Sequence, residues 1–259
     1  MVEPTTEGAA QLADRWFTPA ATPAPMRLFC FPFAGANPNY FLPWRKLLAP
    51  QLELRIGVLP GHGPRWSEPP IDDLAHLVAE LAAAVAEVSD RPFAFFGHSV
   101  GALVAFEVAR RLRHEGLQGP ASLWVSAAEG PQTRSLRRHL HELADAELVH
   151  ALGDYNGTSP ELLADTELMQ LLLPGLRADF ALNERYRYRP DAPLDTPIHL
   201  LRSDRDPYVS ASGAAGWVLE TSAGLREYVY TGDHFFIEEH RDAVIDLLKA
   251  GCVPGPSLR

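Results

Sequence analysis

The sequence predicts an α/β fold with a mainly parallel sheet, helices on both faces of that sheet and a helical insertion. Two features support this prediction. Short apolar runs alternate with longer segments of helical periodicity, which is the order that parallel strands joined by crossover helices require. The runs are almost continuously apolar and do not alternate with polar residues, so we expect their strands to be buried on both faces.

Six apolar runs are the expected strands, at 28–31, 54–59, 93–96, 123–125, 198–201 and 228–230. Between them, residues 72–88 carry apolar side chains at spacings of three and four, with Asp72 or Asp73 as the N-cap. A second helix should follow Ser99 and end near Gly116, and a last helix should cover about 238–248.

Residues 131–189 interrupt this alternation, because they contain no strand signal. Helical patterns cover 139–152, 162–173 and 176–187, and Pro174-Gly175 separates the last two. We expect a lid over the C-terminal edge of the sheet, where ligands of open α/β sheets bind, with packing at the side of the sheet as the alternative. The other expected parts are an N-terminal arm at 1–25, a core at 26–130 and 190–250, and a C-terminal tail at 251–259. Trp16 and Phe17 should pin the arm to the core.

The composition is that of a folded protein that binds neither nucleic acid nor membrane. The 259 residues are 46% hydrophobic, and the formal net charge is −10 at pH 7. Nucleic acid and anionic membranes both attract basic proteins, so this acidity disfavours them. No apolar run reaches the ~18–20 residues of a membrane helix. The N-terminus lacks the apolar region of a secretory signal, and we expect Cys30 and Cys252 to be unpaired thiols, so we expect a cytoplasmic protein.

The strongest functional signal is Gly97-His-Ser-Val-Gly101, which lies between an apolar strand and a helix. G-x-S-x-G in this setting is typical of the nucleophile elbow of the α/β-hydrolase fold, where a sharp turn exposes the serine. The two glycines omit side chains that would clash where the helix passes the strand. Ser99 is therefore the expected nucleophile. His98 should support the turn, because a neighbour within the elbow points away from the serine.

A serine hydroxyl needs a base to take its proton, and the base needs a carboxylate to orient it. In this fold the chain order is serine, then acid, then histidine. The acid should follow the strand at 198–201, where Asp204 and Asp206 both qualify. We prefer Asp206, which lies in the last turn of the loop and precedes Pro207. His234 is the expected base, because it lies between the last strand and the last helix.

The oxyanion hole needs two backbone N–H donors. We expect one from Val100, directly after the nucleophile, and the other from the loop at 31–36, which follows the first strand. In this loop Ala34 is the expected donor. The alternative is that the loop only connects a strand to a helix.

Together, these segments resemble the type II thioesterases that accompany modular polyketide and nonribosomal peptide synthases. The loop Phe-Pro-Phe-Ala-Gly at 31–35 looks like the FPxAG loop of that family, and residues 59–65 with 68–70 are similar to its PGRxxR…EPP segment. Leu-Arg-Ala-Asp-Phe at 176–180, with Tyr186 and Tyr188, matches its RADF…Y.Y stretch, and residues 232–236 match its GxHFF segment. The resemblance extends from Trp16 to about Leu248.

The resemblance implies the same site residues as the spacing does. Ser99, Asp206 and His234 would be the triad, and Ala34 and Val100 the oxyanion donors. The sequence departs from the family where His62 replaces an arginine, Phe33 replaces a frequent histidine and Val100 replaces a common methionine. Residues 154–156 also differ from the family pattern. These departures leave the chemistry intact and bear on acyl preference.

The resemblance also implies a reaction and a partner. The enzyme would hydrolyse acyl thioesters on the phosphopantetheine arm of acyl or peptidyl carrier domains, and so remove aberrant or stalled acyl groups. No metal or bound cofactor is expected, because the pantetheine belongs to the partner. We expect a monomer, since no exposed apolar stripe is evident. The alternatives are a carboxylesterase or acyltransferase with the same triad, and a catalytically silent binding partner of a synthase.

Carrier domains are generally acidic, so a local basic patch would be needed to dock one on this acidic chain. The candidates are arginines at the two ends of the insertion, with a solvated arginine-rich face as the alternative. They are Arg134, Arg137, Arg138, Arg185, Arg187 and Arg189.

Overall fold

One six-stranded parallel sheet organises the protein. The computed structural model describes residues 10–134, 139–155 and 157–252. The strand order is β2-β1-β3-β4-β5-β6, and all neighbouring pairs are parallel. The strands are β1 (Met26–Phe31), β2 (Leu52–Ile56), β3 (Phe93–His98), β4 (Leu123–Ser126), β5 (Ile198–Ser203) and β6 (Leu225–Tyr230). Each of the six predicted runs overlaps one of these strands, so the predicted parallel sheet is confirmed.

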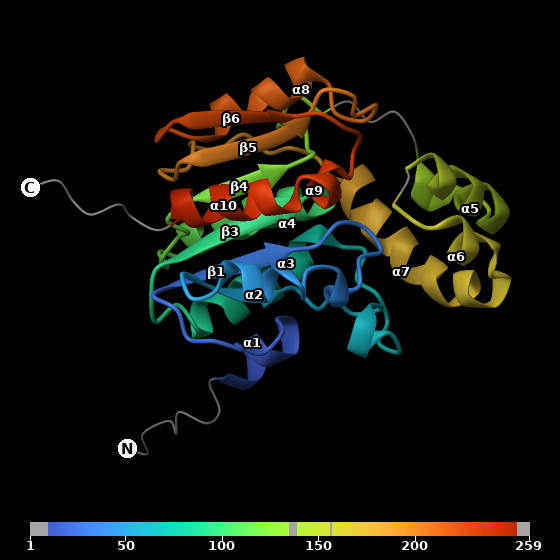
Figure 1. The fold of residues 1–259 in the computed structure, drawn as a ribbon, viewed down its shortest axis with the longest axis horizontal. Coiled ribbons are helices and arrows are strands. Elements are labelled where there is room, and N and C mark those ends of the chain that lie inside the picture. Colours follow the sequence, from blue (N-terminus) through green and yellow to red (C-terminus); the bar gives the residue numbers. More distant parts are fainter. Residues whose placement is uncertain (1–9, 135–138, 156, 253–259) are drawn as a thin grey trace, which may run out of the picture.

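Helices cover both faces of the sheet, as predicted (Figure 1). One face packs against α1 (Ala10–Trp16), α3 (Leu74–Glu87) and α4 (Val100–His114), and the other against α2 (Trp44–Leu48) and α10 (Arg241–Cys252). Strand β1 shows why both faces are apolar: Phe29 and Phe31 pack on the first face, and Leu28 and Cys30 on the second. The shorter elements are α8 (Ala211–Ala215), α9 (Phe236–Glu239), and the 3-10 turns Pro38–Tyr40, Gly63–Arg65, Leu140–Glu142 and Gly216–Glu220.

The N-terminal segment is anchored to the core by two aromatic residues, as predicted. Trp16 and Phe17, at the end of α1, are buried in the core. The Arg65 guanidinium lies 4.4 Å from the Trp16 ring centroid and donates two hydrogen bonds to Glu68, of 2.8 and 2.7 Å. The segment that contains Arg65 and Glu68, which resembles the family's PGRxxR…EPP pattern, therefore holds α1 against the core. None of the described helices combines the length and apolar character needed to cross a membrane.

The segment predicted as a lid contains α5 (Asp145–Asp154), α6 (Pro160–Ala164) and α7 (Thr166–Glu184), which extend beyond one end of the sheet (Figure 1). The prediction of separate helices at 162–173 and 176–187 is wrong, because α7 continues through Pro174. A proline at this position removes one helical hydrogen bond. Burial of Leu173 and Leu176 in the apolar cluster of the lid outweighs this loss. The helix predicted at 139–152 begins later, with α5.

The structure corrects two further expectations, one about the last strand and one about the last helix. Strand β6 is not buried on both faces: it pairs only with β5, and Arg226, Glu227 and Val229 are exposed. The last helix is longer than predicted and broken, since α9 is followed by α10, which continues to Cys252. The first two residues of the expected tail at 251–259 are therefore helical, and 253–259 lie outside the described residues.

Candidate active site

The nucleophile elbow forms because the backbones of β3, α4 and β1 approach very closely. Ser99 connects β3 to α4 with φ 56° and ψ −122°, a conformation that residues with side chains rarely adopt. A Cβ atom on Gly97 would lie 2.2 Å from the carbonyl oxygen of Gly101, and one on Gly101 would lie 2.0 Å from the carbonyl oxygen of Phe31. Only glycine fits at both positions. The elbow is completed by the Ser99 N–H, which donates to the Ser126 carbonyl at 2.8 Å.

His234 bridges Ser99 and Asp206. Its Nε2 lies 3.0 Å from Ser99 Oγ, and its Nδ1 lies 2.7 Å from Asp206 Oδ2. The backbone N–H of Tyr208 donates to Asp206 Oδ1 at 2.8 Å, so both oxygens of this fully buried carboxylate are used. The structure therefore brings the three predicted residues together in one hydrogen-bonded chain. This arrangement can remove the proton of the serine hydroxyl and stabilise the resulting imidazolium.

The two rival residues have other partners. Asp204 Oδ1 accepts from the Gly232 N–H at 3.1 Å and so braces the loop before His234. His98 Nδ1 lies 2.9 Å from Ser126 Oγ, which ties the elbow to β4. Burial, together with the nearby His234, lowers the pKa of His98 well below 6.5, so this imidazole stays neutral. Both contacts fit supporting roles.

A carboxylate from the lid helix holds the predicted oxyanion loop. The Gly35 N–H donates to Asp179 Oδ2 at 2.7 Å, and Gly35 has φ 74°, which favours glycine. A Cβ on Gly35 would lie 2.4 Å from Leu176, so α7 packs directly on this loop. Ala34, the preceding residue, lines the same cavity as Ser99 and Val100. Sequence reasoning included Asp179 only as part of a motif and missed this contact.

His62 completes the support of Asp179. Its Nε2 lies 2.9 Å from Asp179 Oδ2, and its Nδ1 lies 3.1 Å from the Pro60 carbonyl oxygen. Burial opposes a positive charge on this imidazole, but the Asp179 carboxylate and the Pro60 carbonyl outweigh burial and raise the pKa of His62 above 6.5. Gly175 allows this approach, because a Cβ there would lie 3.3 Å from the His62 ring. The residue that departs from the family pattern therefore links α7 of the insertion to the core.

The cavity beside Ser99 has a volume of about 340 Å³. It lies at the carboxyl ends of the strands, where ligands of open parallel sheets bind, because Ser99 follows β3 and Ala127 follows β4. From the lid side it is lined by Tyr155, Asp179 and Phe180. The site is thus a pocket between core and insertion, with the serine, the histidine and both predicted oxyanion residues on its wall.

A family model described as a thioesterase domain matches residues 26–252. The chain belongs to the thioesterase family. It is 34% identical to the gramicidin S biosynthesis protein GrsT of Aneurinibacillus migulanus, over 91% of this chain and 93% of that protein. It is 35% identical to the thioesterase PikA5 of Streptomyces venezuelae, over 87% of this chain and 80% of that protein.

Solved structures agree. The type II thioesterase BorB from the borrelidin biosynthetic cluster matches with a TM-score of 0.84 and 34% identity, over 91% of this chain and 96% of that chain. The predicted α/β-hydrolase fold and the resemblance to type II thioesterases are therefore confirmed. The protein is an enzyme that hydrolyses thioesters.

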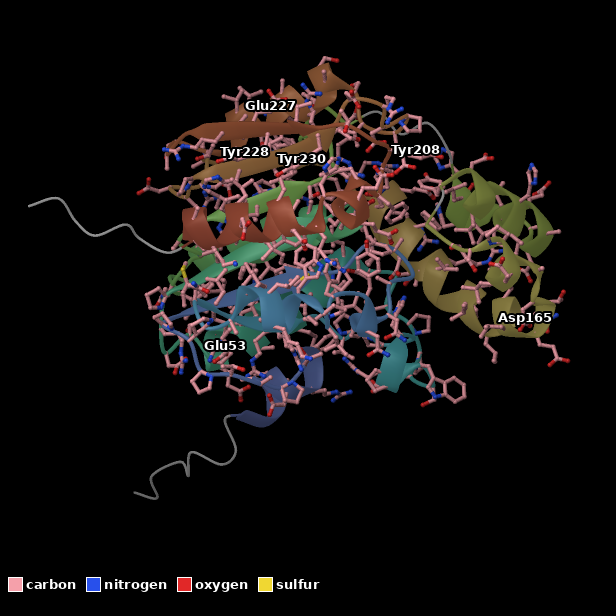
Figure 2. The ribbon with its side chains drawn as sticks, viewed as in Figure 1. Glu53, Asp165, Tyr208, Glu227, Tyr228 and Tyr230 are labelled. Carbon is pink, nitrogen blue, oxygen red and sulfur yellow. The ribbon has the colours of Figure 1, made fainter. Side chains whose placement is uncertain are left out.

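Two tyrosines missed by sequence reasoning join the insertion of the thioesterase to His234. The rings of Tyr155 and Tyr208 stack with centroids 4.0 Å apart, and Tyr208 Oη donates to the Asp154 carbonyl at 3.1 Å. Both rings lie against His234, at centroid distances of 6.1 and 5.5 Å. Figure 2 shows Tyr208 where the core meets the lid. The off-pattern residues 154–156 were the available signal, although Asn156 itself lies outside the described residues.

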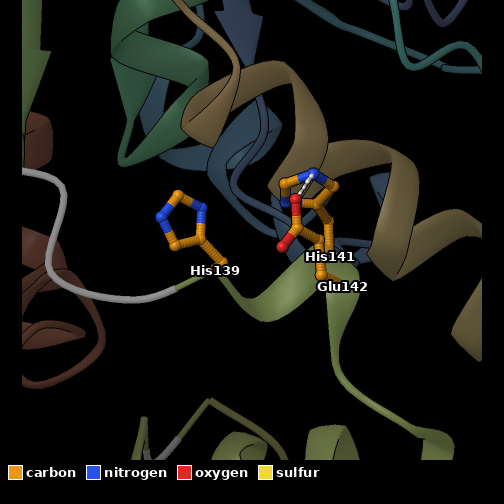
Figure 3. Close-up of side chains that lie close together, drawn as sticks. All are labelled: His139, His141 and Glu142. Carbon is orange, nitrogen blue, oxygen red and sulfur yellow. Dashed lines mark ion pairs between the residues drawn. The ribbon is translucent and has the colours of Figure 1, made fainter.

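Within the described part of the thioesterase, one group of side chains has the composition of a metal site, namely His139, His141 and Glu142 (Figure 3). Both nitrogens of His141 are already engaged: Nδ1 lies 2.5 Å from Glu184 Oε2, and Nε2 accepts from Arg185 Nε at 3.2 Å. The adjacent guanidinium would repel a cation. These contacts use His141 to fasten the 3-10 turn Leu140–Glu142 to the end of α7.

The predicted basic patch is divided by the structure. Arg134 is half-buried and lines the cavity. Arg185 is exposed and donates to Asp72 Oδ2 at 2.7 Å. Arg137 and Arg138 lie outside the described residues. Carrier docking therefore remains a prediction for the arginines that follow α7, which are Arg185, Arg187 and Arg189.

The His62–Asp179 pair predicts a pH-dependent contribution to stability. Folding raises the pKa of His62 above its unfolded value near 6.5, so the contribution is complete below that pH and is lost as pH rises through the folded pKa. We expect the free energy of unfolding of wild type, relative to His62→Gln, to fall as pH increases above about 6.5. Denaturant unfolding at a series of pH values measures this.

His150→Gln is the matched control, because His150 is exposed on α5. It should show no such trend. If the difference in free energy of unfolding between wild type and His62→Gln does not change with pH, the charge on His62 contributes nothing to stability.

Proposed function

We propose that this thioesterase hydrolyses acyl thioesters from the phosphopantetheine arm of acyl or peptidyl carrier domains, and so removes aberrant or stalled acyl groups from a polyketide or nonribosomal peptide synthase. The observation that carries the proposal is the hydrogen-bonded chain from Ser99 through His234 to Asp206, which opens into a cavity beneath the insertion. The similarity to BorB, PikA5 and GrsT supports the choice of substrate. We further propose that residues 131–189 act as a lid on the core at 26–130 and 190–250, and that the enzyme is a cytoplasmic monomer.

The first half of the reaction transfers the acyl group to Ser99. His234 Nε2 takes the hydroxyl proton while Ser99 Oγ attacks the thioester carbonyl, and Asp206 stabilises the imidazolium through Nδ1. The negative charge on the tetrahedral carbonyl oxygen is stabilised by the N–H groups of Ala34 and Val100, the latter at the N-terminus of α4. When the C–S bond breaks, the imidazolium gives its proton to the pantetheine sulfur, and an ester on Ser99 remains.

The second half releases the acid. Water takes the place of the thiol, and His234 removes its proton as the oxygen attacks the ester carbonyl. The same N–H groups stabilise the second tetrahedral intermediate. Collapse breaks the C–O bond to Ser99, which recovers its proton from His234. The products are a free carboxylic acid and the carrier thiol, and the enzyme is unchanged.

The alternatives differ in leaving group or acceptor. A carboxylesterase would release an alcohol from an oxygen ester, and an acyltransferase would deliver the acyl group to an alcohol in place of water. A silent binding partner would have no need of a base within hydrogen-bonding distance of the serine. The 3.0 Å contact between His234 and Ser99 favours an active enzyme.

Two neighbouring carboxylates supply a matched test of the acid. Asp206→Asn should lower kcat by about 10³- to 10⁴-fold, because an amide in place of the carboxylate favours the wrong tautomer of His234. Asp204→Asn should keep kcat within about 10-fold of wild type, since Asp204 accepts only from the loop backbone. Steady-state hydrolysis of a short acyl thioester measures both. Equal losses in the two variants would contradict the role of Asp206.

The substrate assignment predicts a preference for carrier-bound thioesters. We expect faster acid release from a short acyl-pantetheinyl carrier protein than from the matching acyl-CoA, and slower hydrolysis of the matching oxygen ester. Ser99→Ala should lower the carrier reaction by about 10⁴-fold or more. Release of labelled acid, with and without added acceptor alcohol, measures all of these rates.

Each alternative has its own signature in that assay. Cleavage of oxygen esters alone would make the protein a carboxylesterase, and acyl ester formation with the alcohol would make it an acyltransferase. Activity that survives Ser99→Ala would remove the proposed mechanism.

A further inference from the structure

The cavity that begins at Ser99 has a polar region which the proposed reaction does not use. The apolar part of its wall comprises Val100, Leu103, Phe180, Val209 and Trp217. The polar part comprises Glu129, Arg134, Asn183 and Glu184. In this region Arg134 Nη2 donates to Asn183 Oδ1. Arg134 Nη1 is buried and has no hydrogen-bond partner among the described residues.

The position of Arg134 relative to the reacting carbonyl can be estimated along helix α7. Asp179 accepts a hydrogen bond from the Gly35 N–H, so this point of α7 lies beside the predicted oxyanion loop. Asn183 lies four residues further along α7, which is about 6 Å along the helix and on the same face. Because Arg134 is bonded to Asn183, its free N–H lies about one helical turn from the oxyanion loop. An acyl chain attached to Ser99 would pass this donor.

The guanidinium is held in place before any substrate arrives. The preceding residue, Thr133, donates through Oγ1 to the Gly213 carbonyl at 2.7 Å, and a Cβ on Gly216 would lie 2.2 Å from Thr133 Oγ1. On its other side Arg134 lies over the ring of Tyr186, 5.6 Å from its centroid. The Tyr186 hydroxyl donates to Glu107 at 2.7 Å, which fixes that ring. Arg134 is therefore held directly by α7, and its neighbours Thr133 and Tyr186 are in turn bonded to α8 and α4.

A buried donor without an acceptor is unfavourable, and here the donor is charged. Burial lowers the pKa of Arg134, an effect that Tyr186 and Glu129 oppose. An acceptor delivered by a ligand would satisfy the N–H that the protein leaves free. A purely alkyl chain has no acceptor, so the free energy cost of the unsatisfied Arg134 N–H would remain.

The neighbouring carboxylates decide what kind of acceptor fits. Glu129 and Glu184 line the same cavity and are both largely buried. A carboxylate on the substrate would meet these like charges in a poorly solvated pocket, whereas an uncharged oxygen would not. A ketone or amide carbonyl accepts a hydrogen bond from a guanidinium without adding charge.

We propose that Arg134 is a specificity-determining residue that donates a hydrogen bond to an uncharged carbonyl oxygen carried on the acyl group beyond the thioester. The preferred substrates are then oxygenated acyl chains, and simple alkanoyl groups are poorer ones. The inference rests on the proposed function, since it places an acyl chain from Ser99 in this cavity.

Three N-acetylcysteamine thioesters whose acyl groups have the same number of non-hydrogen atoms test the proposal: 5-oxohexanoyl, 5-methylhexanoyl and glutaryl. They place a ketone, a methyl branch or a carboxylate at the same distance from the reacting carbon. We expect wild type to show a kcat/KM for the ketone about 10-fold above that for the branched alkyl chain, because an unmet charged donor is costly. The glutaryl thioester should be slower than the ketone.

Variants separate Arg134 from general effects on the lid. Arg134→Met should reduce the ketone-to-alkyl ratio of kcat/KM to about 1. Arg177→Met is the matched control: this arginine of α7 pairs with Asp145 and lies outside the lining of the cavity, so the ratio should remain that of wild type. A ratio that Arg134→Met leaves unchanged would overturn the proposal.

The wild-type comparison decides the question even if Arg134→Met does not fold. Equal kcat/KM values for ketone and alkyl thioesters, with hydrolysis dependent on Ser99, would overturn the Arg134 subsite and leave the thioesterase mechanism standing. Preference for the glutaryl thioester would overturn the uncharged acceptor. Hydrolysis of none of the three would overturn both the subsite and the proposed function.

Discussion

The close contact between the start of α4 and the end of β1 is the constraint on which the site depends. No side chain fits at Gly97 or Gly101, because its Cβ would lie within 2.2 Å of backbone oxygen. With these two backbones in contact, Ser99 is forced to φ 56° and projects from the turn. The same contact brings the loop after β1 beside the N-terminus of α4. Ala34 and Val100, which are far apart in the sequence, therefore share one cavity wall.

The insertion adds a second layer of support, and it acts through single side chains. Asp179 on α7 holds the Gly35 N–H of the loop, and His62 from the core holds Asp179 in turn. Tyr155 stacks on Tyr208, whose backbone N–H holds the carboxylate of Asp206. Direct contacts therefore join the insertion both to the predicted oxyanion loop and to the segment that holds Asp206.

Sequence reasoning predicted the sheet and the chain from Ser99 to His234, because both depend on local patterns in a known order. The elbow motif fixes Ser99 within a strand–turn–helix unit, and the ends of two later strands limit the acid and base to a few residues. Sequence reasoning failed where contacts between distant segments determine the local structure. Pro174 suggested a helix end, but burial of the flanking leucines in the lid keeps α7 continuous.

Arg134 is a similar case. Its neighbours in sequence suggested a surface patch, whereas its hydrogen bond to Asn183, 49 positions away, and the bond from Thr133 to Gly213 hold it at the cavity. The partners of Asp179 lie 144 and 117 residues away, at Gly35 and His62, so no local pattern reveals them. Side-chain direction in loops depends on such long-range packing, which a single sequence does not display.

The most direct test of the account is to look for the acyl group on Ser99 during turnover. The enzyme would be mixed with a short acyl-pantetheinyl carrier protein, quenched in acid within the first turnover and digested for peptide mass spectrometry. The account predicts that the peptide containing Ser99 gains the mass of the acyl group minus one hydrogen, and that Ser99→Ala forms no adduct and releases no acid. Turnover without any adduct on Ser99, or an adduct on another residue that forms as fast as acid is released, would contradict it.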